Sequence, residues 1–381
     1  MKVVFWSNIY TRHQESLSNA LNGMAEKYTF IAEMEEKQPL ELLGKAARKE
    51  PAFVQHANNK NRKKLIRWVS ENADVVILGV PAPDLVYACL KRRIPIFRYT
   101  ERPFKGSMSV SKLILRALRW RTWNPPGALI YMLCAGAYTA GDYLKIGMFR
   151  NRTFKWGYFS EFKRSQSIEE LLDKKDCSQI LWAGRLLDWK HPETALFLAK
   201  ELSGKGLHFK LKLIGSGPMR PELEKLRKTL KIEEYTELSE SVSPEKLREI
   251  MELSGIFLMT SDKHEGWGAV VNEAMSCGCA VIGSSQAGSV PFLIKSGING
   301  YMYSYSDQTE LLKMAEDLLR NPGKQKEMGE KACQTIETEW NAEEAAGRFM
   351  KLADCILKEG GLEEYESGPC SRAILIPEDR H

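Results

Sequence analysis

Two series of short, uninterrupted apolar runs constrain the fold of this 381-residue chain more than any other feature. The runs lie at Lys2–Trp6, Thr29–Glu33, Asp74–Gly79, Pro95–Tyr99 and Ala128–Leu133, and again at Ile180–Ala183, Lys210–Ile214, Gly255–Met259, Ala280–Gly283 and Gly300–Tyr303. Most of them lack the alternation of polar and apolar residues that a half-exposed strand shows, and amphipathic stretches separate them. The pattern predicts α/β structure with parallel strands that helices cover on both faces.

A polar, highly charged segment at residues 160–176 separates the two series. It predicts an N-terminal domain over residues 1–165 and a C-terminal domain over residues 166–340, each a parallel βαβ domain. Residues 360–381 show no period and are expected to form a mobile tail. Ligands bind to such sheets at the carboxyl ends of the strands, so we expect the chemistry there, beside a cleft between the domains.

Composition and the N-terminal residues exclude several classes of protein. The longest uncharged stretch, Thr122–Gly141, contains two prolines and three glycines, which makes it a poor membrane span. Arg12, His13 and Glu15 lie where a signal peptide needs an apolar block. The eight cysteines are scattered, so neither a disulfide framework nor a structural zinc is expected. We expect a reduced, cytoplasmic protein.

The net charge of +6 conceals a division between the two halves. Residues 1–165 hold 28 Lys and Arg against 13 Asp and Glu, whereas residues 166–381 hold 27 against 36. Such asymmetry indicates two domains with different partners. The basic half suits an anionic membrane surface or nucleic acid, and no stacking-aromatic motif accompanies the charge to favour nucleic acid.

One predicted helix, Ser109–Trp123, concentrates this basic charge. Its apolar face carries Val110, Leu113, Ile114, Ala117 and Trp120, another face carries Lys112, Arg116 and Arg119, and Arg121 interrupts the apolar side. Arg and Trp together suit a membrane interface, and the cluster of Lys60, Arg62, Lys63, Lys64 and Arg67 adds to that charge. The alternative is an ordinary helix that covers the sheet and exposes a solvated face.

Two loops that follow predicted strands of the second half carry candidates for phosphate binding. Gly184, Arg185 and Lys190 follow Ile180–Ala183, and two cations in one strand-to-helix loop can neutralise the charge of a leaving diphosphate. Gly215 and Gly217 follow the next strand and would let a ligand approach the backbone. Solvated loop charges and a plain tight turn are the alternatives.

The most informative segment is residues 264–274, after the strand that ends at Met259. It contains Glu265, Gly266, Trp267, Gly268 and Glu273. The glycines would open a helix whose N–H groups favour an anion, with Glu273 about two turns into it. Carboxylates accept hydrogen bonds from sugar and ribose hydroxyls. Either glutamate alone is more typical of a surface charge, but the two together in this glycine-rich segment favour a binding role. The small residues at 284–289 follow the next strand and form a further contact or only a turn.

These motifs together resemble the retaining nucleotide-sugar glycosyltransferases of family four, also called group one. The resemblance rests on the Gly-Arg-Leu at residues 184–186 with Lys190, on the Ile-Gly-Ser-Gly-Pro at residues 214–218, and on Glu265 and Glu273 separated by seven residues. It covers residues 178–305 most clearly. It implies the GT-B fold, in which two Rossmann-like domains face a deep cleft, and residues 341–359, after Trp340, resemble the helix that crosses back to the N-terminal domain.

The resemblance also implies roles for these residues. Arg185 and Lys190 would hold the diphosphate, Glu273 the ribose and Glu265 the donor sugar, while Gly184, Gly215 and Gly217 would lie along the donor. Backbone groups around Gly266, Trp267 and Gly268 would line the sugar–phosphate site. The family is metal-independent, and since this chain contains no Asp-x-Asp motif, we expect neither a metal nor another cofactor.

The N-terminal half departs from the family pattern at two positions. The first strand–helix loop, residues 7–15, lacks the Gly-Gly pair that the family often has, and we assign its His13 to the acceptor, with a surface position as the alternative. The loop after Pro95–Tyr99 lacks the family histidine. Glu101 is the nearest polar group there, and we expect it to stabilise an oxocarbenium-like state.

The resulting prediction is a retaining, metal-independent hexosyltransferase of cell-surface polysaccharide biosynthesis. It would move a sugar from a nucleoside-diphosphate sugar to a glycan acceptor, expected to be lipid-linked, at the inner face of the membrane. Two alternatives stay open: a nucleotide-sugar epimerase or hydrolase of the same fold, and a non-catalytic subunit that binds nucleotide sugar.

Overall fold

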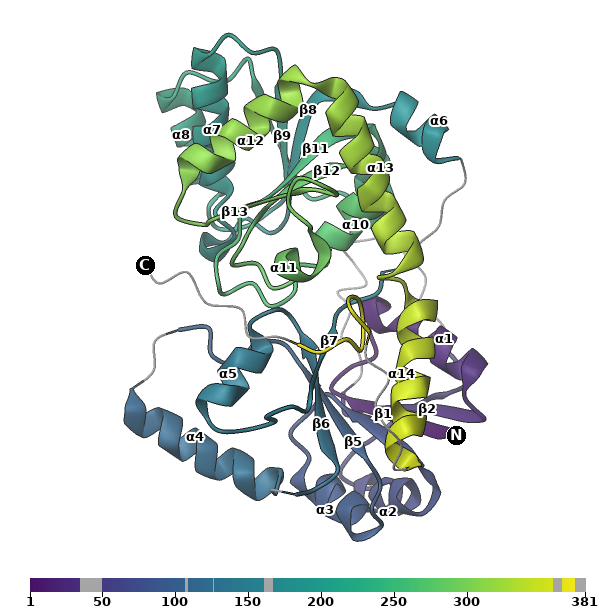
Figure 1. Cartoon of the computed structure of the whole chain (residues 1–381). Helices are drawn as coiled ribbons and strands as arrows, with labels where there is room; N and C mark the ends of the chain where they lie inside the picture. The colour runs from purple at the N-terminus through teal and green to yellow at the C-terminus, as the bar shows by residue number, and fades with distance from the viewer. Residues whose placement is uncertain (35–49, 107–108, 126, 161–166, 359–364, 374–381) are drawn as a thin grey trace. The chain divides into compact units, whose positions relative to one another are not determined.

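The computed structural model describes residues 1–34, 50–106, 109–125, 127–160, 167–358 and 365–373. The chain forms two compact units (Figure 1). Unit 1 consists of Met1–Glu161 and Trp340–Ile376, and unit 2 of Phe162–Glu339 with Pro377–His381. Each unit is built around its own parallel sheet.

Unit 1 contains a seven-stranded sheet in the order β3-β2-β1-β4-β5-β6-β7. The strands are β1 (Lys2–Ser7), β2 (Lys27–Ala32), β3 (Val54–His56), β4 (Val75–Leu78), β5 (Ile96–Thr100), β6 (Ile130–Ala135) and β7 (Thr153–Trp156). All of the pairings are parallel. Among the described residues, a helix lies between each pair of strands that follow each other in the chain, except between β2 and β3, and a parallel pairing requires such a crossover connection.

Helices cover both faces of this sheet. They are α1 (Arg12–Met24), α2 (Arg62–Asn72), α3 (Pro83–Lys91), α4 (Val110–Trp123), α5 (Thr139–Lys145) and α14 (Ala342–Leu357). One apolar cluster joins the sheet to α2, α3 and α5, with α4 packed at its margin. On the other face the Phe349 ring of α14 lies 5.0 Å from that of Phe97 on β5. Figure 1 shows α1 and α14 together on that side.

Unit 2 contains a six-stranded parallel sheet in the order β10-β9-β8-β11-β12-β13. The strands are β8 (Asp176–Ala183), β9 (Lys210–Ile214), β10 (Thr236–Ser239), β11 (Ser254–Met259), β12 (Ala280–Ser284) and β13 (Tyr301–Tyr303). The helices are α6 (Ile168–Asp173), the 3-10 helix η1 (Asp188–Lys190), α7 (Pro192–Gly204), α8 (Arg220–Thr229), α9 (Pro244–Leu253), α10 (Val270–Ser276), α11 (Val290–Leu293), α12 (Gln308–Arg320) and α13 (Pro322–Thr338).

The order of the strands locates the functional edge of unit 2. From β8 the chain proceeds to β9 and β10 on one side, and it then returns to β11 on the other side of β8. The two neighbouring strands β8 and β11 therefore form the switch point at which the connections diverge, and ligands of open α/β sheets bind at such points. The loops that follow β8 and β11 lie next to each other there.

The predicted α/β fold class, with two Rossmann-like domains that each contain a parallel sheet, is confirmed, and each of the ten predicted runs forms a strand. The strands that the sequence pattern did not indicate are β3, β7 and β10, and each is an edge strand. An edge strand contacts one neighbour instead of two, so it needs fewer apolar residues and leaves a weaker pattern.

The predicted tail is wrong for residues 365–373, which pack against β7 in unit 1. Phe154 and Arg372 form an antiparallel bridge. The Lys155 N–H donates to the Ser371 carbonyl at 2.7 Å, and Cys370 is buried. The hydrogen-bonding groups of the edge strand are satisfied in this way. The remaining residues of the predicted tail lie outside the described residues.

Helix α4 differs from the other helices of unit 1 because none of its residues is buried. Leu113, Ala117 and Trp120 pack against the core as the sequence indicated, but Val110 and Ile114 of the same predicted face are exposed. Within the described residues, no helix is both long enough and apolar enough to cross a membrane.

Candidate functional site

The loops after β8 and β11 are joined by backbone hydrogen bonds at the carboxyl edge of unit 2. The Asp262 N–H donates to the Trp189 carbonyl at 3.0 Å. The Thr260 hydroxyl donates to the Lys190 carbonyl at 2.6 Å and accepts from the Trp182 indole at 2.8 Å. These bonds hold the two loops in one arrangement, so side chains from both can act on one ligand.

Lys190 and Glu265, which sequence analysis assigned to the same site, are in direct contact across these loops. The Lys190 Nζ lies 2.5 Å from Glu265 Oε2, and the side chains are only 15% and 14% exposed. The Ser261 hydroxyl donates to the same carboxylate oxygen at 3.1 Å. This partly buried ion pair places one cation and one carboxylate at the switch point. The cation can bind phosphate oxygens, and the carboxylate can accept hydrogen bonds from sugar hydroxyls.

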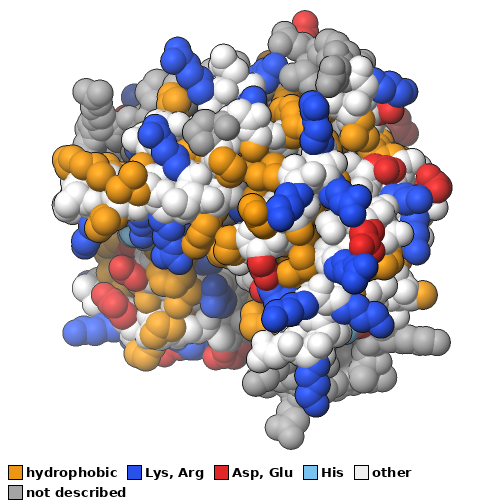
Figure 2. Space-filling view, turned by 90° about the horizontal axis from the view of Figure 1, so that it is seen from below, with side chains coloured by type: hydrophobic (Ala, Val, Ile, Leu, Met, Phe, Trp, Pro, Cys, Tyr) orange, Lys and Arg blue, Asp and Glu red, His pale blue; other side chains and the backbone are white. Residues whose placement is uncertain are grey.

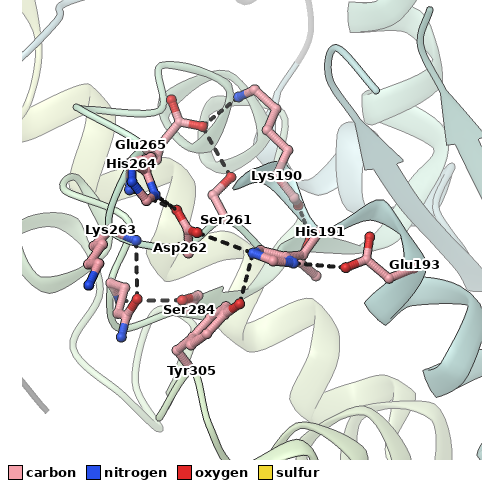
Figure 3. A network of polar contacts seen from close by, with 12 residues as sticks. Lys190, His191, Glu193, Ser261, Asp262, Lys263, His264, Glu265, Ser284 and Tyr305 are labelled. Atoms are coloured by element: carbon pink, nitrogen blue, oxygen red, sulfur yellow. Dashed lines mark hydrogen bonds and ion pairs between the residues drawn. The ribbon is translucent and has the colours of Figure 1, made fainter. Parts of the chain in front are cut away.

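His191 follows Lys190 and is the centre of a second group of polar contacts (Figure 3). Its Nδ1 lies 2.8 Å from Glu193 Oε1, and its Nε2 lies 3.3 Å from Asp262 Oδ2 and 2.8 Å from the Tyr305 hydroxyl. Hydrogen bonds to the Asp262 and Glu193 carboxylates raise the pKa of His191 to about 9. The imidazole is therefore charged at neutral pH.

Asp262 connects this group to the loop that carries Glu265. Its Oδ1 accepts from the His264 N–H at 2.7 Å and lies 3.0 Å from His264 Nδ1, while its carbonyl accepts from the Glu265 N–H at 3.1 Å. Burial alone would raise the pKa of Asp262, but the hydrogen bonds from His191 and His264 outweigh it and lower that pKa. Asp262 is therefore an anion that fixes the position of the loop.

Arg185 and Glu273 lie on the two segments that carry the Lys190–Glu265 pair. Arg185 is exposed in the loop after β8; its carbonyl accepts from the Leu187 N–H at 2.8 Å, and its side chain forms no hydrogen bond or ion pair with the described residues. Glu273 lies in the first turn of α10 rather than two turns into a helix, because the helix begins at Val270, after the glycines. Both residues lie on the segments that follow β8 and β11.

Two glycines of the predicted donor site, Gly215 and Gly217, have a packing role. A Cβ at Gly215 would lie 1.9 Å from the Gly184 carbonyl oxygen, and one at Gly217 would lie 2.4 Å from the Leu186 carbonyl oxygen. The loops after β8 and β9 therefore approach each other backbone to backbone, so Gly215 and Gly217 are required whether or not a ligand is bound.

The segment 266–268 is likewise fixed by packing. The Trp267 side chain is completely buried and its indole donates to Asn272 Oδ1 at 2.8 Å, so it belongs to the core and only its backbone can face a ligand. Gly268 has a φ of +85°, and a Cβ there would lie 2.5 Å from the Met259 methyl group. Gly266 precedes them and is buried.

In unit 1 the structure brings together the two candidates that sequence analysis proposed there. The Tyr158 hydroxyl donates to Glu101 Oε1 at 2.8 Å, and the His13 and Tyr158 rings stack with centroids 5.7 Å apart. Lys105 lies 3.5 Å from Glu101 Oε2. These residues follow β1, β5 and β7, so they lie at the carboxyl edge of this sheet and combine aromatic surface with hydrogen-bonding groups.

A buried ion pair supports the loop that carries Glu101. Arg102 and Asp142 are 3% and 0% exposed, and two N–H groups of Arg102 each lie 3.3 Å from one oxygen of Asp142. Asp142 also accepts from the Phe104 N–H at 3.1 Å. The pair joins this loop to helix α5.

Sequence analysis missed Tyr158, His191, Asp262 and Tyr305. Tyr158 comes after the edge strand β7, which the sequence pattern did not indicate, and Tyr305 comes after β13, which was predicted without any candidate residue behind it. His191 follows Lys190 directly and Asp262 precedes Glu265 by three residues, so the available signal was a titratable group near an assigned residue in a strand-to-helix loop. Among the described residues, no three His, Cys, Asp or Glu side chains gather as metal ligands would.

The segment that contains the unit 2 site has relatives of known family. Residues 163–335 match the model of the family Glycosyl transferases group 1. The match covers all the loops at the carboxyl edge of the unit 2 sheet, including Lys190 and Glu265.

This chain spans half or less of the length of the curated relatives that it matches. N-acetyl-alpha-D-glucosaminyl L-malate synthase of Bacillus anthracis is 29% identical over 150 residues, which are 39% of this chain and 38% of that protein. Alpha-D-kanosaminyltransferase of Streptomyces kanamyceticus is 26% identical over 170 residues, 45% of this chain and 44% of that protein.

Solved structures share the fold over nearly the whole chain. Anabaena Alr3699/HepE in complex with UDP gives a TM-score of 0.67 at 14% identity, covering 92% of this chain and 98% of that one. WaaG, a glycosyltransferase involved in lipopolysaccharide biosynthesis, gives a TM-score of 0.58 at 15% identity, covering 90% and 98%. This chain therefore has the fold of these GT-B proteins.

Proposed function

We propose that this protein is a retaining glycosyltransferase that moves a sugar from a nucleoside-diphosphate sugar to a glycan acceptor. The observation that carries the proposal is the contact of Lys190 with Glu265 at the switch point of a segment that matches the glycosyl transferases of group 1. The relative HepE is solved with UDP and with UDP-glucose, which supports a donor of this class.

In the proposed reaction the bond between the anomeric carbon and the diphosphate oxygen breaks, and a bond to the acceptor oxygen forms on the same face of the sugar. The acceptor proton passes to the leaving phosphate oxygen. Arg185 and Lys190 neutralise the diphosphate as its charge develops, so the proposal includes no metal and no further cofactor. Glu265 hydrogen-bonds the sugar and Glu273 the ribose.

We assign the acceptor to the cluster of His13, Glu101 and Tyr158 in unit 1. Stacked aromatic rings beside a carboxylate suit a saccharide, since a sugar offers an apolar face and donating hydroxyls. Two similar proteins support a glycan acceptor of cell-surface polysaccharide type: the structural neighbour WaaG, which is involved in lipopolysaccharide biosynthesis, and a putative colanic acid biosynthesis glycosyltransferase, WcaL, of Salmonella typhimurium.

The donor assignment predicts selective stabilisation by one class of nucleotide sugar. UDP-, GDP- and ADP-sugars are compared in a thermal-shift assay, and one of them at about 100 times its Kd should stabilise the protein by about 2.7 kcal/mol. Lys190→Met should remove most of that shift. If no nucleotide sugar raises the melting temperature, the donor assignment is wrong.

A turnover assay distinguishes sugar transfer from epimerisation, from hydrolysis and from binding without catalysis. The donor found by thermal shift is incubated with and without lipid-linked and soluble glycan acceptors, and products are identified by mass spectrometry. Product that appears only with acceptor, with the anomeric configuration of the donor, supports the proposal. Altered or released sugar without acceptor indicates an epimerase or hydrolase, and binding without turnover indicates a non-catalytic subunit.

We further propose that helix α4 binds an anionic membrane surface and that the protein takes its lipid-linked acceptor from that surface. Its exposed apolar side chains are Val110, Ile114, Leu115 and Leu118, between 55% and 72% exposed. α4 lies in the lower part of Figure 1, and Figure 2, seen from that side, shows hydrophobic side chains interspersed with Lys and Arg.

The cations of α4 lie beside this apolar surface and complement anionic lipid. They are Lys112, Arg116, Arg119 and Arg121, and each basic side chain near such a surface contributes about 1 kcal/mol. The helix is also firmly held, because the buried Arg98 donates to Asn124 at its C-terminal end at 2.9 Å and lies over the Trp120 ring. A fixed amphipathic helix with a basic border is typical of interfacial binding.

Vesicle sedimentation tests the membrane proposal. The protein should bind phosphatidylglycerol vesicles, bind phosphatidylcholine vesicles weakly, and lose affinity as salt rises. The double variant Ile114→Glu, Leu118→Glu should reduce binding about tenfold or more, since two apolar contacts are replaced by charges that the lipid repels. Phe197→Glu on α7, where Phe197 is 47% exposed, is the matched control. Failure to bind at every salt concentration would refute the proposal.

A further inference from the structure

We propose that His191 is a positioning residue, whose side chain holds the Lys190 loop against the Glu265 loop so that both residues meet a nucleoside diphosphate. This inference rests on the proposed function, because it specifies what keeps the donor site assembled. The imidazole itself is not expected to touch the ligand.

The backbone conformation at His191 indicates that its imidazole has a structural role. The residue has φ 47° and ψ 53°, in the left-handed region that disfavours residues with a Cβ. This conformation ends η1 and begins α7, and it is glycine that adopts it most readily. A histidine is retained there at a cost in free energy, which its three side-chain contacts offset.

Those contacts come from three separate elements of unit 2. Glu193 belongs to α7, Asp262 to the loop after β11, and Tyr305 to the segment after β13. Figure 3 shows the imidazole between them, with Lys190 and Glu265 on the adjoining side of the group. The imidazole therefore joins the N-terminus of α7 to two loops that are distant in sequence.

Asp262 links the His191 side chain to the two loops that carry the proposed ligand-binding residues Lys190 and Glu265. Its backbone N–H holds the Trp189 carbonyl, its backbone carbonyl holds the Glu265 N–H, and its carboxylate is the group that meets His191. Removal of the imidazole leaves the Asp262 carboxylate with His264 as its one side-chain partner among the described residues. We therefore expect both ends of the Lys190–Glu265 contact to gain freedom together.

The charge of the imidazole is set by the groups around it. The facing carboxylates are those of Glu193 and Asp262. The Tyr305 hydroxyl oxygen accepts from Nε2 of the charged imidazole, Asp188 of η1 lies near Tyr305, and Lys190 is adjacent in the chain. The pKa of His191 is raised above its unfolded value of 6.5 to about 9. The stabilisation is therefore complete below pH 6.5 and is lost as the pH rises through about 9.

Two substitutions at His191 separate the side chain from the backbone. His191→Gly removes the imidazole and relieves the left-handed strain, so it should fold. His191→Asn tolerates the left-handed region and can still donate to one carboxylate, so it should recover part of the effect. Lys231→Gly is the matched control, because Lys231 has φ 53° in the same unit but precedes β10, at the opposite edge of the sheet.

The first measurement needs no nucleotide. The Lys190 amine is labelled with an acetylating reagent at neutral pH and quantified by mass spectrometry. His191→Gly should label Lys190 several times faster than wild type, His191→Asn should lie between them, and Lys231→Gly should match wild type. Equal labelling of Lys190 in wild type and His191→Gly would overturn the proposal, whatever nucleotide the protein binds.

The second measurement is the affinity for UDP, GDP or ADP, taking the one that wild type binds most tightly. His191→Gly should bind this nucleotide about tenfold more weakly than wild type at pH 6.5, a loss of the size expected when one charge-assisted hydrogen bond is removed. Above pH 9, where the imidazole is neutral, the ratio of the wild-type affinity to the His191→Gly affinity should fall toward one. A ratio that is the same at both pH values would contradict the role of the charged imidazole.

The two measurements distinguish failure of this inference from failure of the proposed function. Lys190 labelling that responds to His191→Gly, in a protein that binds no nucleoside diphosphate, would support the positioning role and refute the donor site. Tight wild-type binding that His191→Gly leaves unchanged, at temperatures well below both melting transitions, would support the donor site and refute the positioning role.

Discussion

Replacement of Lys190 by methionine is expected to lower kcat/KM for sugar transfer by about a hundredfold or more, the size of effect seen when one preorganised donor to a developing charge is removed. Two consequences combine in this variant. The positive charge that faces the leaving diphosphate is lost, and the Glu265 carboxylate, only 14% exposed, loses its cation. The loss should appear both in the KM for the donor and in kcat, because Lys190 contacts the diphosphate in the ground state and the charge on the diphosphate grows as the bond breaks.

Three further variants identify the cause of that loss. Arg185→Ala removes the second proposed cation from an exposed position and should lower kcat without altering the Lys190–Glu265 contact. Glu265→Gln keeps the shape of the carboxylate and tests the pair. Lys246→Met is the matched control, since Lys246 is an exposed lysine 2.7 Å from Glu249 on α9. Wild-type rates in both Arg185→Ala and Lys190→Met would refute the diphosphate assignment.

Replacement of Asp142 by asparagine is expected to destabilise unit 1 by about 3–5 kcal/mol, because it removes the buried negative charge that faces the buried Arg102 guanidinium. Arg102 is 3% exposed, whereas Lys145, the second cation on Asp142 at 3.2 Å, is 47% exposed and can be solvated. The Phe104 N–H retains an acceptor in asparagine, so the loss is one of charge rather than of shape. The effect should extend to Glu101, which the same loop carries.

Hydrogen exchange measured by mass spectrometry is the suitable readout, because it reports each unit separately. Peptides of β5, β6 and α5 should exchange faster in Asp142→Asn, while peptides of unit 2 serve as the internal reference. Asp173→Asn is the control, since its pair with Lys326 is exposed and should contribute about 0–1 kcal/mol. Unchanged exchange in unit 1 would show that Arg102 finds another partner and would contradict the prediction.

The agreement between sequence and structure is closest where a residue has a strong local requirement. Unalternating apolar runs identified every strand with neighbours on both sides. Ser243 followed by Pro244 located the start of α9, where the Ser243 hydroxyl accepts from the Lys246 N–H. Burial on two faces and capping of a helix are properties of a few adjacent residues, so a sequence records them directly.

The candidate site was predictable only in part. Lys190 and Glu265 were assigned to one site because both follow strands whose carboxyl ends meet, and the structure places them in contact. Residues 266–268 were assigned to the ligand, but the structure also gives them a packing role, since Trp267 is buried and Gly268 has no room for a Cβ. A glycine or tryptophan that packing requires cannot be distinguished in sequence from one that a ligand requires.

The sequence alone therefore determined the two parallel α/β units, the edge of each sheet where chemistry is expected and the cations and carboxylates that follow the central strands. Only the tertiary structure decided that His191, Asp262 and Tyr305 form one group, that Tyr158 joins His13 to Glu101, and that much of the apolar face of α4 is exposed. The physical reason is that strand and helix patterns depend on near neighbours, whereas a polar contact between loops depends on which strands the chain makes adjacent.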